Sequence, residues 1–147
     1  MNERGGPPEG RGKFLLREAD ARLEEAKTLS EHKHYEAACG RSWTSATYGL
    51  TGFLHRTGAG VSVDCDDLLG LGVQVRKRAG RRPPAEFQEA IWRLSAYREE
   101  PLAERVAPRG YGEADAETAL SAAKVVLKQV DEWIGQAKRG SQDPAAP

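Results

Sequence analysis

Residues 35–50 read Tyr35-Glu-Ala-Ala-Cys-Gly-Arg-Ser-Trp-Thr-Ser-Ala-Thr-Tyr-Gly-Leu50, and this stretch decides the fold. Small and apolar side chains recur in it at helical spacing, which predicts one buried helical face. Small residues on such a face let a neighbouring backbone approach closely. The stretch therefore predicts the central helix of a packed bundle. The residues of its core face are Tyr35, Ala38, Cys39, Ser42, Ala46, Gly49, Leu50 and Phe53.

The composition indicates one folded domain without a global charge bias. A chain of 147 residues is long enough to bury a core, and its 22 Lys and Arg balance 22 Asp and Glu. A globally basic nucleic-acid binder is therefore not indicated, although a local basic patch stays open. The chain contains no run of about 18 apolar residues, and its polar N-terminus lacks the apolar segment of a signal peptide. We expect a cytoplasmic protein with no membrane span.

Helical periodicity indicates one domain, residues 13–138. The arms on either side of it are rich in Gly, Pro and charged residues. Residues 1–12 and 139–147 are predicted to be disordered. The short connection at 32–34 favours an antiparallel hairpin. We therefore predict an all-α, antiparallel up-and-down bundle of four to five helices. The expected helices cover residues 13–32, 35–56, 64–80, 83–97 and 113–138.

Three aspartates open the third expected helix. The Asp64 carboxylate is placed to accept from exposed backbone N–H groups, and Asp66 and Asp67 favour the positive end of the helix dipole. We prefer this helix start to a metal site, because calcium loops need a longer array of ligands. No metal and no cofactor are expected, and Cys39 is expected to be buried as a small apolar residue.

The stretch from Tyr35 to Ala46 resembles the second helix of HEPN domains (higher eukaryotes and prokaryotes nucleotide-binding). A first helix rich in Ala, Leu and Glu and an Ala-rich last helix closing on Trp133-Ile134 fit the same pattern. The triplet Arg41-Ser42-Trp43 is similar to an Arg-Ala-Tyr element of one bacterial branch. The similarity covers roughly residues 13–138, and it implies an antiparallel bundle that forms homodimers.

The resemblance also implies a catalytic segment near the start of the last helix. Many HEPN domains resemble metal-independent ribonucleases, in which an Arg grips phosphate and a His a few residues later acts as general acid or base. The two motifs of a dimer meet in a cleft. A Tyr two positions after the His is the residue that a partner nucleotidyltransferase can modify.

The corresponding segment of this chain is Glu104-Arg-Val-Ala-Pro-Arg-Gly-Tyr111. Tyr111 fits the modified tyrosine, but Arg109 stands where the His belongs. Glu104 stands where the first Arg belongs, unless the register slips by one and Arg105 takes that role. Because the pKa of an arginine stays above about 12, Arg109 cannot shuttle protons near neutral pH. We therefore expect no ribonuclease activity. The expected binding cleft comprises Arg41, Glu104, Arg105, Arg109 and Tyr111.

Arg41 lies on the helix lined by small residues, where a charged side chain needs a partner. A structural ion pair with Glu99, Glu100 or Asp115 is favoured over a ligand contact. The three histidines, His32, His34 and His55, lie outside the segment 104–111 and are expected in turns or at a helix end. The three tryptophans, Trp43, Trp92 and Trp133, are expected in the core or a dimer interface.

The strongest charge run is Arg76-Lys-Arg-Ala-Gly-Arg-Arg82. A solvated helix C-terminus, where cations complement the dipole, is the favoured interpretation. A phosphate-binding patch is the alternative. The residues of this basic patch are Arg76, Lys77, Arg78, Arg81 and Arg82.

Three functions remain open from the sequence. We favour a noncatalytic HEPN-like dimeric module in a defence or toxin–antitoxin setting. It would bind a partner, for which a nucleotidyltransferase is one candidate, or a nucleotide or RNA. The alternatives are a divergent metal-independent ribonuclease, which would use Arg105, Arg109 and Tyr111, and a generic helical module that binds RNA or nucleotide.

Overall fold

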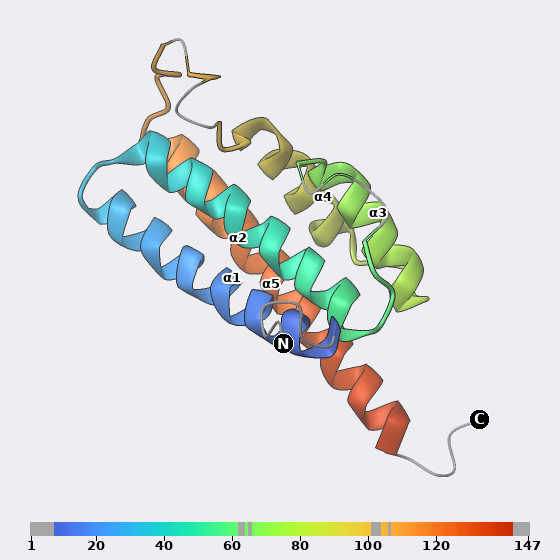
Figure 1. The fold of residues 1–147 in the computed structure, drawn as a ribbon. Helices are drawn as coiled ribbons and strands as arrows, with labels where there is room; N and C mark the ends of the chain where they lie inside the picture. The colour runs from blue at the N-terminus through green and yellow to red at the C-terminus, as the bar shows by residue number, and fades with distance from the viewer. Residues whose placement is uncertain (1–7, 62–63, 65, 101–103, 106, 143–147) are drawn as a thin grey trace.

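The computed structural model describes residues 8–61, 64, 66–100, 104–105 and 107–142. These residues form five α-helices and one short 3-10 helix, η2, and contain no strand (Figure 1). The predicted all-α class is confirmed. The helices are α1 (Pro8–Glu31), α2 (Tyr35–Arg56), α3 (Leu68–Ala79), α4 (Ala85–Leu94), η2 (Ser95–Tyr97) and α5 (Glu113–Gln142).

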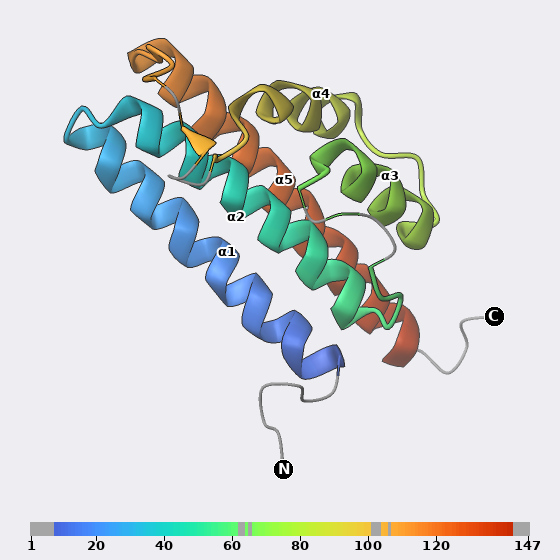
Figure 2. The same cartoon turned by 45° about the horizontal axis from the view of Figure 1, so that its top comes forward.

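The three long helices, α1, α2 and α5, lie side by side, and the shorter α3 and α4 pack against one side of them (Figures 1 and 2). α1 and α2 form the expected antiparallel hairpin. Its turn places Lys33 at a left-handed φ of 65°, and the His34 N–H donates to the Leu29 carbonyl at 2.8 Å. α5 runs beside α2 in the same direction (Figure 1). The first turns of these two helices therefore lie at one end of the bundle, and their last turns at the other.

The small residues of α2 bring neighbouring helices unusually close. A Cβ atom on Gly12 of α1 would lie 2.5 Å from the backbone nitrogen of Arg56 and 2.8 Å from the carbonyl oxygen of Gly52. On the side of α5, a Cβ on Gly49 would collide with the Leu127 side chain. The close backbone approach is therefore between α1 and α2 at Gly52 and Arg56, which lie outside the predicted face, whereas Gly49 of that face meets a side chain of α5.

An aromatic cluster joins α2, α4 and α5 inside the core. The Trp133 ring lies 6.1 Å from the Phe53 ring and 5.1 Å from the Phe87 ring, centroid to centroid. Trp43 is buried as well, so two of the three tryptophans occupy the core as expected. Trp92 is 69% exposed, because α4 turns Phe87, Ala90, Ile91 and Leu94 toward the core instead. A core position is therefore wrong for Trp92, and its place in an interface stays a prediction.

Several helix ends differ from the predicted ones. α1 begins at Pro8, five residues earlier than expected, since a proline at the first helical position gives up only an N–H that would have no partner. α5 continues to Gln142. Residues 8–12 and 139–142, which were predicted to be disordered, are helical, whereas the disorder of residues 1–7 and 143–147 stays a prediction because they lie outside the described part of the chain.

Asp67, and not Asp64, caps α3. The Asp67 Oδ1 atom accepts from the backbone N–H of Gly70 at 2.9 Å, whereas Asp64 accepts from the N–H of Asp66 at 3.0 Å in the preceding turn. The predicted cap at Asp64 was three residues too early, because the third helix begins at Leu68.

None of the described helices is long and apolar enough to span a lipid bilayer.

Candidate functional site

The segment 104–111 meets the first turn of α2 at one carboxylate, Glu36. The backbone N–H of Arg109 donates to Glu36 Oε1 at 2.6 Å, and the Arg105 guanidinium lies 3.4 Å from Glu36 Oε2. This segment belongs to the connection that leads into α5. Its contacts with Glu36 therefore hold that connection against α2. Both arginines of the segment therefore share one acidic partner.

The Arg109 side chain is held by Glu100 and Tyr111. Its Nη2 atom lies 2.6 Å from Glu100 Oε1, and its Nη1 atom lies 3.5 Å from the Tyr111 hydroxyl. Partial burial alone would lower the pKa of Arg109, but the hydrogen bonds to Tyr111 and Glu100 outweigh it, so that the pKa is raised. Arg109 therefore stays protonated and cannot act as a general acid or base near neutral pH.

Tyr111 packs against Tyr97 at the start of α5. Its hydroxyl donates to the Ala96 carbonyl at 3.0 Å, and its ring meets the Tyr97 ring edge-on at 5.0 Å. The Tyr97 hydroxyl in turn donates to Asp115 Oδ1 at 2.9 Å. Burial and the hydrogen bond to Asp115 raise the pKa of Tyr97 to about 12. The hydroxyl of the buried Tyr97 is therefore held in place by Asp115, whereas the Tyr111 side chain is half-buried.

Arg41 bridges two carboxylates, Glu25 of α1 and Glu99 of the connection after η2. The Thr44 hydroxyl also donates to Glu99. The expected structural ion pair is present, and Glu99 is one of its three proposed partners. Glu25 was missed, because the sequence does not reveal which residues of the first helix lie opposite Arg41.

The expected cleft residues are therefore joined through carboxylates. Arg41 and Arg109 contact the consecutive residues Glu99 and Glu100. Glu104 takes a different partner: it lies 3.9 Å from Arg98, which itself lies 3.0 Å from Asp66. We name this region, near the first turns of α2 and α5, the carboxylate end. Its acidic side chains are Glu25, Glu36, Glu99, Glu100 and Asp115.

Cys39 lies beneath the carboxylate end as a free, fully buried thiol, as expected. Burial, and then the nearby charges of Asp115 and Glu36, raise the pKa of Cys39 to about 12. The thiol is therefore protonated over the physiological range and is a poor nucleophile there.

One histidine lies closer to the carboxylate end than the sequence indicated. His34 is the residue that precedes α2, two positions before Glu36, and its side chain is exposed. Side chains two positions apart do not face each other on a helix. No hydrogen bond or ion pair joins His34 to the described residues of the segment 104–111. The described residues also contain no group of three or more His, Cys, Asp or Glu side chains that could hold a metal ion.

A broad hollow of about 980 Å³ borders Arg41 on the face formed by α1 and α2. Aromatic and aliphatic side chains line much of it, including Phe14, Trp43, Tyr48 and Val61. Phe14 is 52% exposed. An exposed aromatic beside an apolar hollow is typical of a surface that contacts another protein.

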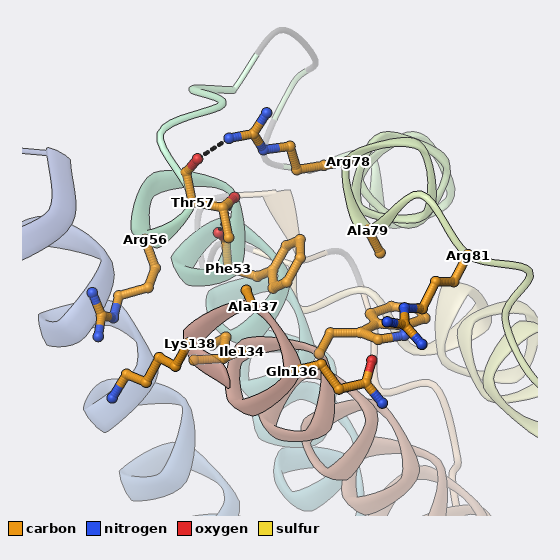
Figure 3. Close-up of a pocket in the computed structure, with 11 residues that line it drawn as sticks. Phe53, Arg56, Thr57, Arg78, Ala79, Arg81, Ile134, Gln136, Ala137 and Lys138 are labelled. Carbon is orange, nitrogen blue, oxygen red and sulfur yellow. Dashed lines mark hydrogen bonds between the residues drawn. The ribbon is translucent and has the colours of Figure 1, made fainter. Parts of the chain in front are cut away.

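The basic patch lies at the other end of the bundle from the carboxylate end, near the last turns of α2 and α5. Its residues line two neighbouring hollows. Arg78 and Arg81 line a cavity of about 420 Å³ together with Arg56 and Lys138 (Figure 3). The other three cations, Arg76, Lys77 and Arg82, line a neighbouring hollow around Gly80. We name the region formed by these seven cations the basic end. Arg56 and Lys138 were missed as members of this cluster, because they lie far from the basic patch in the sequence.

Known proteins share this fold and sequence pattern. The model of the HEPN domain family matches residues 13–133. The crystal structure of TT1696 from Thermus thermophilus is similar with a TM-score of 0.70 and 26% identity, covering 84% of this chain and 98% of that one. No match to a curated protein reaches significance.

Two further crystal structures show the fold alone. An archaeal HEPN homologue, ST0689, has a TM-score of 0.65 and 22% identity, covering 84% of this chain and 97% of its own. A HEPN domain protein from Thermotoga maritima has a TM-score of 0.63 and 20% identity, covering 83% of this chain and 98% of its own.

Proposed function

The chain belongs to the HEPN domain family, and from this premise we propose that it is a noncatalytic, dimeric module that binds a partner protein. The partner that the family resemblance favours is a nucleotidyltransferase, in a defence or toxin–antitoxin setting. The observation that carries the noncatalytic role is the pairing of Arg105 and Arg109 with Glu36 and Glu100.

A ribonuclease of the metal-independent type needs a cation that can grip phosphate and a group that transfers protons near neutral pH. The carboxylates beside Arg105 and Arg109 would repel an incoming phosphate. Arg109 occupies the position of the general acid or base, and its raised pKa excludes that role. The segment is therefore better suited to holding the bundle together, and to presenting Tyr111, than to cleaving RNA.

The partner and the second subunit require exposed surface near this segment. The hollow beside Arg41 offers apolar and aromatic contacts, and it borders Glu99 and Glu100, the partners of Arg41 and Arg109. We expect size-exclusion chromatography with light scattering to report a dimer. A clean monomer at micromolar concentration would count against the dimeric role.

An RNA cleavage assay tests the noncatalytic role. We expect the wild-type protein to leave single-stranded and structured RNA intact, even at high protein concentration. Arg109→Ala and Tyr111→Phe are the variants to compare, because the divergent ribonuclease would use Arg105, Arg109 and Tyr111. Cleavage by the wild type that either variant abolishes would establish the divergent ribonuclease instead.

Coexpression with a small nucleotidyltransferase encoded beside the gene tests the partner role. In such a reaction the Tyr111 hydroxyl oxygen attacks the α-phosphorus of a nucleoside triphosphate, and pyrophosphate leaves. We expect intact-mass spectrometry to detect an added nucleotidyl group that Tyr111→Phe abolishes. Tyr97→Phe is the matched control, because Tyr97 packs on Tyr111 but is buried against Asp115. Equal modification of Tyr111→Phe would contradict the assignment.

Binding of RNA or a nucleotide is the second candidate function. The observation that favours it is the exposure of Arg76, Lys77, Arg78, Arg81 and Arg82 in the last turn of α3 and just after it. A solvated helix C-terminus accounts for some of these charges, since three of the five lie in the last turn of α3.

A further inference from the structure

A groove of about 160 Å³ runs between α3 and α4, on the side of the bundle away from α1 (Figures 1 and 2). The two helices touch at its floor, where a Cβ atom on Gly72 would lie 3.3 Å from a methyl carbon of the buried Ile91. Leu69 and Val73 line the α3 side and are 41% and 44% exposed. The α3–α4 groove is therefore apolar and open to solvent.

Trp92 extends the apolar surface of the groove along α4. It lies one turn after Gln88, which lines the groove, so the two side chains project from the same side of the helix. Phe14, on α1, is the one other large apolar side chain that is exposed among the described residues. Three of four such side chains thus gather at one groove. Single exposed apolar residues are ordinary, but a group of them is typical of a surface that contacts another protein.

The groove continues into the hollow of about 440 Å³ around Gly80. Three residues line both spaces and make them one surface: Arg76, Pro83 and Gln88. None of the described residues that line either space is acidic. Arg76 and Arg82 are exposed, and neither forms an ion pair with a residue that the structure describes. The surface is therefore apolar along the groove and positively charged where it meets the basic end.

We infer that the α3–α4 groove docks an amphipathic helix of a partner protein. Its apolar side chains would cover Leu69, Val73 and Trp92, and its acidic side chains would lie beside Arg76 and Arg82. α3 has 12 residues and is about 18 Å long, so a helix of about three turns covers the groove. Acidic residues are favoured in the first turn of a helix. The docked helix therefore begins at the basic end and runs antiparallel to α3.

The acidic residues of this chain that lie near the groove already have partners, which disfavours a second copy as the occupant. Asp67 caps its own helix, and Asp66 lies 3.0 Å from Arg98. On α4, Glu89 pairs with Arg93. A second copy would have to break such contacts to place its carboxylates on the basic end. A partner helix that carries its own acidic residues does not.

The groove is separate from the surface assigned to the partner protein and the second subunit. It shares no residue with the hollow beside Arg41. The inference therefore goes beyond the proposed function and does not depend on it. Failure of dimerisation, or of modification at Tyr111, would leave the groove as it is.

Fluorescence anisotropy with a labelled peptide and the full chain tests the inference. The probe is an amidated helical peptide of about 14 residues, with glutamates in its first turn and leucines four residues apart on one face. Two control peptides replace the glutamates by lysines or the leucines by serines. We expect the probe to bind at micromolar concentration and both controls to bind at least about 10-fold more weakly. No binding of the probe at millimolar concentration, or equal binding of either control, would overturn the inference.

Variants of the protein locate the docked peptide. Trp92→Ala should weaken binding of the probe by about 10-fold or more, because aromatic anchors dominate the energetics of interfaces. Arg76→Gln should weaken it by about threefold, since an exposed charge contributes less. Phe14→Ala and Arg93→Gln remove an exposed aromatic residue and an exposed arginine outside the groove, so we expect changes below about twofold. Equal losses in these controls would overturn the groove as the site. Circular dichroism confirms that each variant is folded.

The fluorescence of Trp92 measures the same contact directly. Trp43 and Trp133 are buried, so the emission of a solvent-exposed indole comes from Trp92. We expect the probe to shift this emission to shorter wavelength. Trp92→Phe should abolish the shift but keep most of the affinity, because it retains an aromatic ring. An unchanged shift in Trp92→Phe would place the contact elsewhere and overturn the inference.

The same variants distinguish two other occupants. Light scattering should give one mass for the wild type and Trp92→Ala, whereas loss of a dimer in this variant would show that a second copy covers the groove. A monomeric wild type that still binds the probe would contradict the dimeric role alone. We expect a short single-stranded RNA not to displace the probe. Displacement that depends on Arg76 and Arg82, but not on Trp92, would replace the partner helix with a nucleic acid.

Discussion

The two ends of the bundle hold their arginines in opposite ways. At the carboxylate end, Arg41, Arg105 and Arg109 each contact at least one glutamate, and Arg41 contacts two. At the basic end, Arg78 and Arg81 line a cavity whose described residues include no acid. Arg78 donates there to the backbone carbonyl of Thr57 and not to a carboxylate. The same residue type therefore has different surroundings at the two ends.

The ends also differ in what joins the helices. Ion pairs connect α1, α2 and the segment 98–112 at the carboxylate end. At the basic end, α1 and α2 instead pack backbone against backbone at Gly12 and Gly52. This difference predicts that the basic end responds to added volume and the carboxylate end to changes in charge.

The largest expected effect comes from adding one methyl group at the basic end. Gly12→Ala places a Cβ 2.5 Å from the Arg56 backbone nitrogen, so the free energy of unfolding should fall by about 2 kcal/mol. Gly10→Ala is the control: it lies two residues earlier in α1, and its Cβ meets nothing within 4 Å. This control should be neutral or stabilise by up to about 1 kcal/mol. Urea denaturation followed by circular dichroism measures both, and equal stabilities would contradict the close approach.

Alkaline pH should act on the carboxylate end. The pKa of Cys39 is raised in the folded state, so its contribution to stability is complete below the unfolded pKa of about 9 and is lost as pH rises toward about 12. Between pH 8 and pH 10 the protein should lose about 1 kcal/mol of unfolding free energy from this group. Denaturation at both pH values measures the loss. Cys39→Ala should show a correspondingly smaller loss, and an unchanged loss in this variant would show that other groups carry the pH dependence.

The smallest expected change in the free energy of unfolding comes from replacing a paired or an exposed arginine. Arg41→Ala removes a half-buried cation from Glu25 and Glu99 and should lower the free energy of unfolding by roughly 0.5 to 1 kcal/mol. Arg82→Ala, at the basic end, removes an exposed cation and should change it by less than about 0.5 kcal/mol. Thermal and urea unfolding compare the two. If Arg82→Ala proved as costly as Arg41→Ala, the proposed difference between the ends would be wrong.

Much of the fold was predictable because it depends on residues close in the sequence. The periodicity of 35–56 predicted α2 with its observed bounds, and Gly49 of its predicted face does pack closely against the Leu127 side chain of α5. Two predictions, the cap of α3 and the burial of Trp92, were wrong because several neighbouring residues fitted the same local pattern. Asp64, Asp66 and Asp67 are each plausible caps, and only Asp67 reaches a free N–H of α3. Trp92 follows the core residue Ile91, but one step along a helix rotates a side chain by about 100°.

The sequence by itself determined the all-α class, the α1–α2 hairpin and the absence of a histidine from the segment 104–111. These properties follow from spacing and residue type, which act over a few residues. Only the tertiary structure decided that Arg41 pairs with Glu25 and Glu99, and that Arg56 and Lys138 join Arg78 and Arg81 around one cavity. Electrostatic partners depend on how distant helices pack side by side. No local pattern contains that information.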